Sequence, residues 1–352
     1  MQVFHTDTVG NQTEGVFMNS KERLDAFVAG KPVDRRPNLT IVGSVVTQYT
    51  GIDIETYCKD PVKMEEAAAL AARDLDLDYI QIAADLLRSA EGYGTQIAFS
   101  ADALPYVVKP ALDDIEDVDT IKPLKVADIK RVNDLVIAAE IAVKDPDIYP
   151  MVACVGPMTT AANIRGMQDF LMDILDEPEL CDKLLETVMV TIVDLIHRLA
   201  EVGVKYMYVP DPTASLVPPE TYEEHILPLH KRIYAEMEKC GITGRLHMCG
   251  DTTNLIPLTK TCGAKIIDVD AAVDWGAALE EVNNAVILNG NISPTADVYD
   301  ATPEEVTAAM NKCLDQAKNY HAMVMPGCEL PTDTARANVC AIADAIAAAG
   351  AA

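Results

Sequence analysis

Short apolar runs that alternate with longer helical patterns are the feature that most constrains the fold of this chain. The runs are rich in Val, Ile, Tyr or Met and are predominantly apolar, and most lack a regular alternation with polar residues. This pattern is typical of strands in a parallel sheet that is covered on both faces. Eight such runs occur: Leu39–Val46, Tyr79–Ala83, Tyr149–Val155, Tyr206–Val209, Gly244–Met248, Lys265–Val269, Ala285–Leu288 and Ala322–Met325.

Helical patterns occupy most of the intervals between these runs. They cover Asp60–Leu75, Val126–Val143, Asp169–Val202, Pro219–Lys239 and Pro303–Asn319. Eight strand–helix units predict an α/β protein, a (β/α)8 TIM barrel. An open doubly wound sheet is the alternative, because the same alternation of strands and helices also produces that fold.

The intervals also predict how the rest of the chain is organised. Residues 84–148 are too long for one crossover and include a hairpin pattern over Thr95–Val108, so we expect an insertion after strand 2. Residues 1–35 predict an N-terminal extension, a tail followed by a short helix over Ser20–Ala29. We expect residues 1–352 to form a single barrel domain, because such barrels commonly exceed 250 residues.

Charge and cysteine content exclude several classes of protein. The chain has 28 Lys and Arg against 55 Asp and Glu, a formal net charge of −27, which argues against nucleic acid or an anionic membrane as a partner. Its longest apolar stretches, such as Val188–Ile196, are too short to span a bilayer. Nine scattered cysteines, without a basic region and apolar core at the start, predict reduced thiols in the cytoplasm.

Two thiols and one imidazole lie at predicted strand ends, where barrel enzymes carry their chemistry. His247 and Cys249 end the fifth run, and Cys328 follows the eighth. Alternate residues of a strand point to the same side, so His247 and Cys249 both face the barrel mouth. Together the three residues form a zinc ligand set with one open position, as in catalytic zinc sites. Gly250 and Gly327 flank these ligands and let the backbone approach the metal.

Spacing alone leaves a second interpretation open. A single histidine at a strand end is more often a hydrogen-bonding or general-base residue than a ligand, and buried cysteines are common. The other cysteines fall mostly in helical stretches and are expected to be core or surface residues. A phosphate-binding Walker loop, a dinucleotide-binding G-x-G-x-x-G and a G-x-S-x-G nucleophile elbow are all absent from the sequence.

Further polar residues follow the other predicted strands. Asp211 follows the fourth strand, Asp268 and Asp270 follow the sixth, and Asn291 follows the seventh. The three acids are candidate catalytic residues that would orient His247 or take a proton, although acids at strand ends also simply cap loops. Asp211 is the favoured one, because the proline on each side of it restricts its backbone. Asn291 is a candidate for binding substrate.

With these residues laid out, the chain resembles the uroporphyrinogen decarboxylase superfamily, and within it the zinc-dependent methylcobamide:coenzyme M methyltransferases. The resemblance extends over nearly the whole sequence. It is carried by the segments Asn19–Arg23, Gly30–Arg35, Val155–Ala161, Pro210–Pro212, His247–Gly250 and Pro326–Pro331.

The resemblance implies that His247, Cys249 and Cys328 are the zinc ligands. It further implies a methyl group carried on a methylcobamide, a corrinoid bound to a separate partner protein, and a small thiol as acceptor. Coenzyme M is the first expectation for that thiol and homocysteine the second. The sulfonate of coenzyme M needs a cation or a helix N-terminus, and Arg165, which follows the third strand, is the candidate.

Other functions within and beyond the superfamily remain as alternatives. Some members deliver the methyl group to tetrahydrofolate or remove it from a methyl donor. The decarboxylases carry an Arg-rich segment near the N-terminus, whereas this chain has Arg35-Arg36-Pro37-Asn38 at the corresponding place. A non-enzymatic alternative is a module that binds a corrinoid protein. The intact set of three ligands favours the enzyme.

Overall fold

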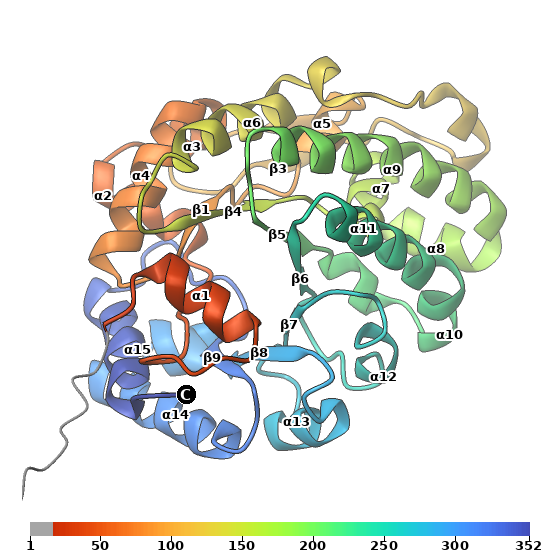
Figure 1. The fold of residues 1–352 in the computed structure, drawn as a ribbon. Coiled ribbons are helices and arrows are strands. Elements are labelled where there is room, and N and C mark those ends of the chain that lie inside the picture. Colours follow the sequence, from red (N-terminus) through yellow and green to blue (C-terminus); the bar gives the residue numbers. More distant parts are fainter. Residues whose placement is uncertain (1–16) are drawn as a thin grey trace, which may run out of the picture.

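A sheet of seven parallel strands lies at the centre of the computed structural model, which describes residues 17–352. The strands are β1 (Tyr79–Ile82), β4 (Tyr149–Ala153), β5 (Tyr206–Pro210), β6 (Thr243–His247), β7 (Ile266–Asp268), β8 (Ile287–Ile292) and β9 (Met323–Pro326), adjacent in this order. Figure 1 shows that the sheet curls and that helices cover its outside. The fold is therefore the barrel-like α/β architecture expected from the sequence, and all strands end at one rim.

The helices of the described chain are, in order, α1 (Ser20–Val28), α2 (Thr47–Thr50), α3 (Ile54–Lys59), α4 (Pro61–Asp74), α5 (Arg88–Gly92), α6 (Lys130–Ala142), α7 (Pro157–Arg165), α8 (Met167–Asp176), α9 (Pro178–Glu201), α10 (Pro219–Thr221), α11 (Leu227–Lys239), α12 (Ile256–Thr259), α13 (Trp275–Val282), α14 (Pro303–Ala317) and α15 (Arg336–Ala349). Local sequence explains several of their ends. Asp60 caps α4, and Thr302 forms a capping box with Glu305 at the start of α14.

One of the eight predicted strands is wrong. Leu39–Val46 forms a buried extended segment that ends in a 3₁₀ helix, η1 (Gly43–Val46), and no regular ladder. The segment still lies beside β1 and β9, because Asp78 donates to the carbonyl of Asn38 and Leu330 to that of Ile41. Its own N–H groups are taken by side chains instead. Asn38 N–H donates to the Asp78 carboxylate, and Val42 N–H donates to Gln81 Oε1.

The pattern over Asp169–Val202 also differs from the prediction, because it contains two helices, α8 and α9. The chain leaves the helical conformation at Glu177, whose φ is −131°. A proline disfavours helical geometry in the residue before it, and Pro178 begins the next helix, where its missing N–H costs nothing. The helical patterns over residues 20–29, 60–75 and 303–319 are confirmed to within two residues.

The predicted insertion is shorter than 84–148. Its last helix, α6, contacts both β1 and β4 and so is an ordinary crossover helix of the barrel. Residues 84–129 contain α5 and a small antiparallel hairpin of β2 (Gln96–Ala98) and β3 (Tyr106–Lys109), where a hairpin was expected. Part of this insertion returns to the rim at which the strands end, as the cavity described below shows.

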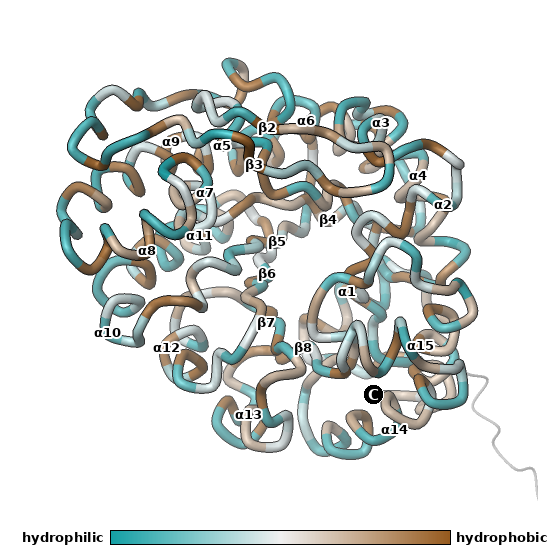
Figure 2. The backbone as a smooth tube through the Cα atoms, turned by 180° about the vertical axis from the view of Figure 1, so that it is seen from behind, coloured by the Kyte–Doolittle hydropathy of each residue, from teal (hydrophilic) through white to brown (hydrophobic). Residues whose placement is uncertain are grey.

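Helix α1 lies across the opposite end of the barrel, where the strands begin. Tyr149 and Tyr206, at the starts of β4 and β5, both donate hydrogen bonds to Asp25. Phe27 stacks on the ring of His321, just before β9. In Figure 2 the outer helices carry hydrophilic and hydrophobic stretches in turn, as expected when one side of a helix packs on the sheet. Within residues 17–352, no helix is long and apolar enough to cross a membrane.

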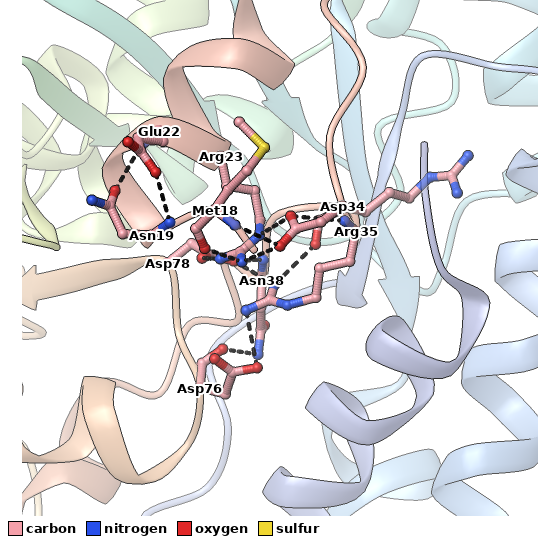
Figure 3. A network of polar contacts seen from close by, with 10 residues as sticks. Met18, Asn19, Glu22, Arg23, Asp34, Arg35, Asn38, Asp76 and Asp78 are labelled. Atoms are coloured by element: carbon pink, nitrogen blue, oxygen red, sulfur yellow. Dashed lines mark hydrogen bonds and ion pairs between the residues drawn. The ribbon is translucent and has the colours of Figure 1, made fainter. Parts of the chain in front are cut away.

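A network of ion pairs holds α1 to the start of β1 (Figure 3). Arg23 forms a bidentate pair with Asp34, with N···O distances of 2.7 and 2.8 Å, and contacts Asp78 at 2.6 Å. Asp78 is fully buried and also accepts from Arg35. Burial acts to raise the pKa of Asp34, but the bonds from Arg23 and from the Met18 backbone outweigh it and lower the pKa to about 2.

This network predicts that the free energy of unfolding falls at acid pH. The pKa of Asp34 is lower in the folded chain than its ordinary value of 3.8, so its stabilisation is complete above about pH 4 and is lost as the pH falls towards 2. The shift in the pKa of Asp34 corresponds to about 2 kcal/mol of stability.

We expect Asp34→Asn to lower the free energy of unfolding by this amount at pH 7, measured by urea denaturation, and by much less near pH 2. Asp113→Asn, at an exposed ion pair with Lys109, is the control and should change stability by less than about 0.5 kcal/mol. A pH-independent effect of Asp34→Asn would contradict the assignment.

Candidate metal centre

His247, Cys249 and Cys328 come together at the rim where the strands end. His247 is the last residue of β6, and Cys249 follows two residues later. Cys328 follows β9, whose last residue is Pro326. Arg245 and His247 are alternate residues of β6 and therefore point to the same inner side of the barrel. The curl of the sheet brings the ends of β6 and β9 within reach of each other, although two strands separate them.

The donor atoms of these three residues are close enough to share one metal ion. His247 Nε2 lies 3.0 Å from Cys249 Sγ and 3.6 Å from Cys328 Sγ, and the two sulfur atoms are 3.0 Å apart. All three side chains are buried or half-buried, and both cysteines are free thiols. Imidazole nitrogen and thiolate sulfur are the donors that zinc takes in proteins, so the residues present fit such an ion.

Asp268 orients the imidazole of His247. Its carboxylate lies 2.8 Å from His247 Nδ1, which leaves Nε2 directed at the two sulfur atoms. Arg245 donates to both oxygens of Asp268, at 2.8 and 3.0 Å, and Asn289 Nδ2 donates at 2.9 Å. A carboxylate behind a ligating histidine is common in metal sites, because it selects the tautomer that leaves the outer nitrogen free.

Arg245 and Asn289 were not among the residues predicted to form the site, although the sequence carries a signal for Arg245. Arg245 is a cation inside an otherwise apolar strand and lies two residues before His247, on the same face. It is 1% exposed, and a charge so deeply buried requires a partner. Asn289 lies among the polar residues at the end of the seventh predicted strand, and its hydrogen bond to Asp268 places it in the site.

The titration of the cluster follows from these contacts. Burial opposes ionisation of Asp268, but the charges of Arg245 and His247 outweigh it and hold its pKa below the ordinary value. For His247, burial is outweighed by the hydrogen bonds to Asp268 and Cys328, which raise its pKa to about 9. The hydrogen bond from Cys249 lowers the pKa of Cys328 and raises that of Cys249 itself.

Two glycines shape the backbone around the cluster, as expected. Gly250 has a φ of +84°, a conformation that residues with a side chain rarely adopt. Gly327 packs against the loop after β7, and a Cβ atom added to it would lie 2.7 Å from Ala271 N. A side chain at either position would therefore displace the chain next to Cys249 or Cys328.

The choice of Asp211 as the acid beside His247 is corrected by the structure. Its carboxylate accepts from the N–H groups of Met158 and Thr159 at the start of α7, at 3.3 and 2.7 Å, and lies 3.0 Å from His230 Nε2. Asp211 therefore caps a helix. Only its backbone N–H contacts His247, through the carbonyl of that residue. The carboxylate thus lies against the start of α7 and does not contact the imidazole of His247.

The remaining predicted residues divide between the site and its surroundings. Asp270 is half-buried in the loop after β7, near Cys249, whose pKa its charge helps to raise. Asn291 donates to the carbonyls of Asp270 and Val273 and so holds that loop, beside a separate polar pocket. Arg165 pairs with Asp173 and Asp169 at 2.8 and 3.1 Å. The structure does not bring Arg165 or Asn291 to the metal cluster.

A cavity of about 520 Å³ opens beside the cluster and is lined by Cys249 and Gly250. Its other walls come from the loops after β1, β5 and β9, from α7, and from the insertion through Leu104 and Pro105. The cavity surface is mostly apolar, with hydroxyl groups from Thr159, Thr213 and Ser215. Glu329 also lines it, and burial raises the pKa of this carboxyl to about 7. Such a cavity accommodates a small molecule next to the metal ligands.

The sequence of the chain matches the uroporphyrinogen decarboxylase (URO-D) family over residues 19–349. The chain belongs to the uroporphyrinogen decarboxylase family. Among characterised members, the methylcobamide:CoM methyltransferase MtbA of Methanosarcina mazei is 29% identical over 327 residues, which are 91% of this chain and 95% of that protein. A uroporphyrinogen decarboxylase of Carboxydothermus hydrogenoformans is 24% identical over 68% of this chain and 69% of its own length.

A solved structure confirms the fold of this family member. A methyltransferase from Methanosarcina mazei superposes with a TM-score of 0.85 at 19% sequence identity, covering 93% of this chain and 98% of that one. The agreement extends over the barrel and its insertion, because both chains are covered almost completely.

Proposed function

We propose that this protein is a zinc-dependent methyltransferase that moves a methyl group from a methyl-cobalt corrinoid to a small thiol. The corrinoid is carried by a separate partner protein. The observation that carries the proposal is the set of His247, Cys249 and Cys328 beside a cavity large enough for a small thiol. Three protein ligands leave a coordination position for substrate, which distinguishes catalytic from structural zinc.

The residues of the chain have distinct tasks in this reaction. His247, Cys249 and Cys328 hold the ion, which when bound lowers the pKa of a coordinating thiol. Asp268 keeps the proton of His247 on Nδ1, and Arg245 keeps Asp268 ionised in its buried position. The apolar cavity wall excludes water from the sulfur atom of the substrate.

The reaction itself is a displacement at carbon. The thiolate sulfur of the substrate attacks the methyl carbon, and the cobalt–carbon bond breaks with its electron pair remaining on cobalt. The products are a thioether and a cob(I) corrinoid. Corrinoid and thiol must meet at the cavity mouth, so we propose that the corrinoid protein docks over the rim where the strands end.

One comparison and one property of the cavity support this activity over decarboxylation. The relative with 29% identity is named as a methyltransferase that acts on methylcobamide and CoM, and it aligns over nearly its whole length. Uroporphyrinogen carries several carboxylates, which require cationic partners. The described residues that line the cavity include no Lys, Arg or His. A cavity without cations does not suit such a substrate.

Demethylation of free methylcobalamin by small thiols tests the proposed function. We expect zinc-loaded protein to convert methylcobalamin to cob(I)alamin under anaerobic conditions. The reaction is measured by the loss of the cobalt–methyl absorption, and the thioether product is identified by mass spectrometry. Because the thiolate is the nucleophile, the rate should rise with pH and then level off. Protein treated with a chelator, and a Cys249→Ala variant, should match the uncatalysed rate. If no thiol reacts although zinc is bound, the proposed direction of transfer is wrong.

A further inference from the structure

The charge of the cavity beside the metal cluster constrains the thiol that it accepts. Asp85 and Glu329 are the only ionisable side chains other than Cys249 among the described residues that line it. Neither carboxyl group can balance the charge of an anionic ligand, whether the carboxyl group is protonated or ionised. The sixteen residues that the structure leaves undescribed, at positions 1–16, contain no Lys or Arg. They therefore cannot supply an arginine or a lysine to the cavity.

Two arginines near this wall face the carboxylate of Asp85, and among the described residues Arg88 Nε, Arg88 Nη2 and Arg131 Nη2 have no hydrogen-bond partner. Arg131 donates to the carboxylate of Asp85, and Arg88 lies 3.8 Å from the same group. Both arginines are buried and neither lines the cavity, whereas Asp85 does. Arg165, the cation expected from the sequence to hold a sulfonate, is bound by Asp169 and Asp173.

Two helices begin at the cavity, α7 and α8. Met167, the first residue of α8, lines the cavity, and the first turn of α8 carries the acidic Asp169. Helix α7 starts at Pro157, and Thr159 of its first turn lines the cavity. Free N–H groups in a first turn ordinarily attract anions. Here the carboxylate of Asp211 accepts from Met158 and Thr159, so the protein's own anion fills this position.

Most neutral donors in the wall also have partners within the protein. The Ser215 hydroxyl donates to the carbonyl of Pro212 at 2.8 Å, and Asn163 Nδ2 donates to the carbonyl of Thr159 at 2.9 Å. An anionic group that entered the cavity would lose its water without gaining a charged partner or a full set of hydrogen bonds. Burial of an uncompensated charge is strongly unfavourable.

From this arrangement we infer that the acceptor thiol has a tail without net negative charge. This inference rests on the proposed function and narrows its substrate class. A neutral or cationic tail can enter the apolar cavity next to Asp85 and Glu329, whereas a sulfonate cannot be compensated there. The chain therefore differs in thiol preference from a methyltransferase whose acceptor is coenzyme M.

Three thiols with the same two-carbon spacer test the inference. They are 2-mercaptoethanol, cysteamine and 2-mercaptoethanesulfonate, which are neutral, cationic and anionic. Initial rates with free methylcobalamin, corrected for the uncatalysed reaction, give kcat and KM for each, and calorimetry on the zinc-loaded protein gives each Kd. We expect the sulfonate to have a kcat/KM and an affinity at least about tenfold below those of the neutral thiol. Homocysteine, a zwitterion, should behave like the neutral thiol.

A variant that adds a cation to the wall provides the matched test. Leu216 lines the cavity and is 61% exposed, so a longer polar side chain can be accommodated at its rim. We expect Leu216→Arg to raise the ratio of kcat/KM for the sulfonate over the neutral thiol about tenfold, through a lower KM. Leu216→Gln, of similar polarity without charge, should leave this ratio within about threefold.

The outcomes separate this inference from the proposed function. If the unaltered protein prefers the sulfonate or uses it as well as the neutral thiol, the inference is overturned and the proposed function stands. If none of the thiols demethylates methylcobalamin, the proposed function fails. In that case the calorimetric Kd values still decide whether the cavity discriminates against the anion.

Discussion

The Cys328→Ala variant is expected to be purified essentially without zinc, whereas the unaltered protein should hold about one zinc ion per chain. Cys328 is one of only three donors in the cluster, and its Sγ lies 3.0 and 3.6 Å from the other two donor atoms. Removal of one leaves two protein ligands, too few for tight binding. Metal analysis of protein purified without chelator gives the stoichiometry.

Two other cysteines serve as controls for this prediction. Cys181 lies in α9 and Cys313 in α14, both buried and away from the cluster. Their alanine variants should retain zinc at the level of the unaltered protein. Full zinc content in Cys328→Ala would show that the ligand set is not His247, Cys249 and Cys328.

The Asp268→Asn variant is expected to have the second largest effect, on both stability and metal affinity. The substitution leaves the guanidinium of Arg245 buried without a charged partner and replaces the carboxylate that orients His247 by a weaker, neutral amide acceptor. Loss of one member of a buried ion pair costs about 3–5 kcal/mol, and loss of the group behind a ligating histidine lowers metal affinity about 10–100-fold. Denaturant unfolding and competition with a chromogenic chelator measure the two effects.

Asp211→Asn is the matched control, because Asp211 is also a fully buried acid beside a histidine. It caps α7 and contacts His230, so its loss should lower the free energy of unfolding by about 1–2 kcal/mol. Its zinc affinity should stay within about threefold of the unaltered value, since its side chain does not contact His247. If both variants lose zinc affinity equally, Asp268 has no special role in orienting His247.

The comparison of Asp211 with Asp268 shows what strand-end position alone can predict. Asp211 directly follows β5 and Asp268 is the last residue of β7, so both were expected near the metal ligands. Position along a strand determines the rim at which a residue lies, but the direction of a carboxylate depends on which donors surround it. Asp211 meets the free N–H groups of α7, whereas Asp268 meets Arg245 and His247. Those donors come from other elements, and the sequence does not reveal their distance.

The segment after Pro37 shows that neighbours in space also decide the local fold. Its apolar residues predicted a strand, and the segment does occupy the place between β9 and β1. Its N–H groups are bound by side chains, among them Asp78 and Gln81, so no ladder forms. Local hydrophobicity determines that a segment is buried, whereas the competition for its backbone donors is decided by its neighbours in space.

By itself, the sequence determined the order of strands and helices, the rim that carries the chemistry, and the three candidate ligands. These features depend on periodicity and on residue type at strand ends, both of which are local. Only the tertiary structure decided that Arg165 is bound by acids, that Asp211 occupies the start of α7, and that the cavity wall presents no cation among the described residues. The physical reason is that a charge is available to a ligand only when no partner within the fold has taken it, and such pairings join residues far apart in the chain.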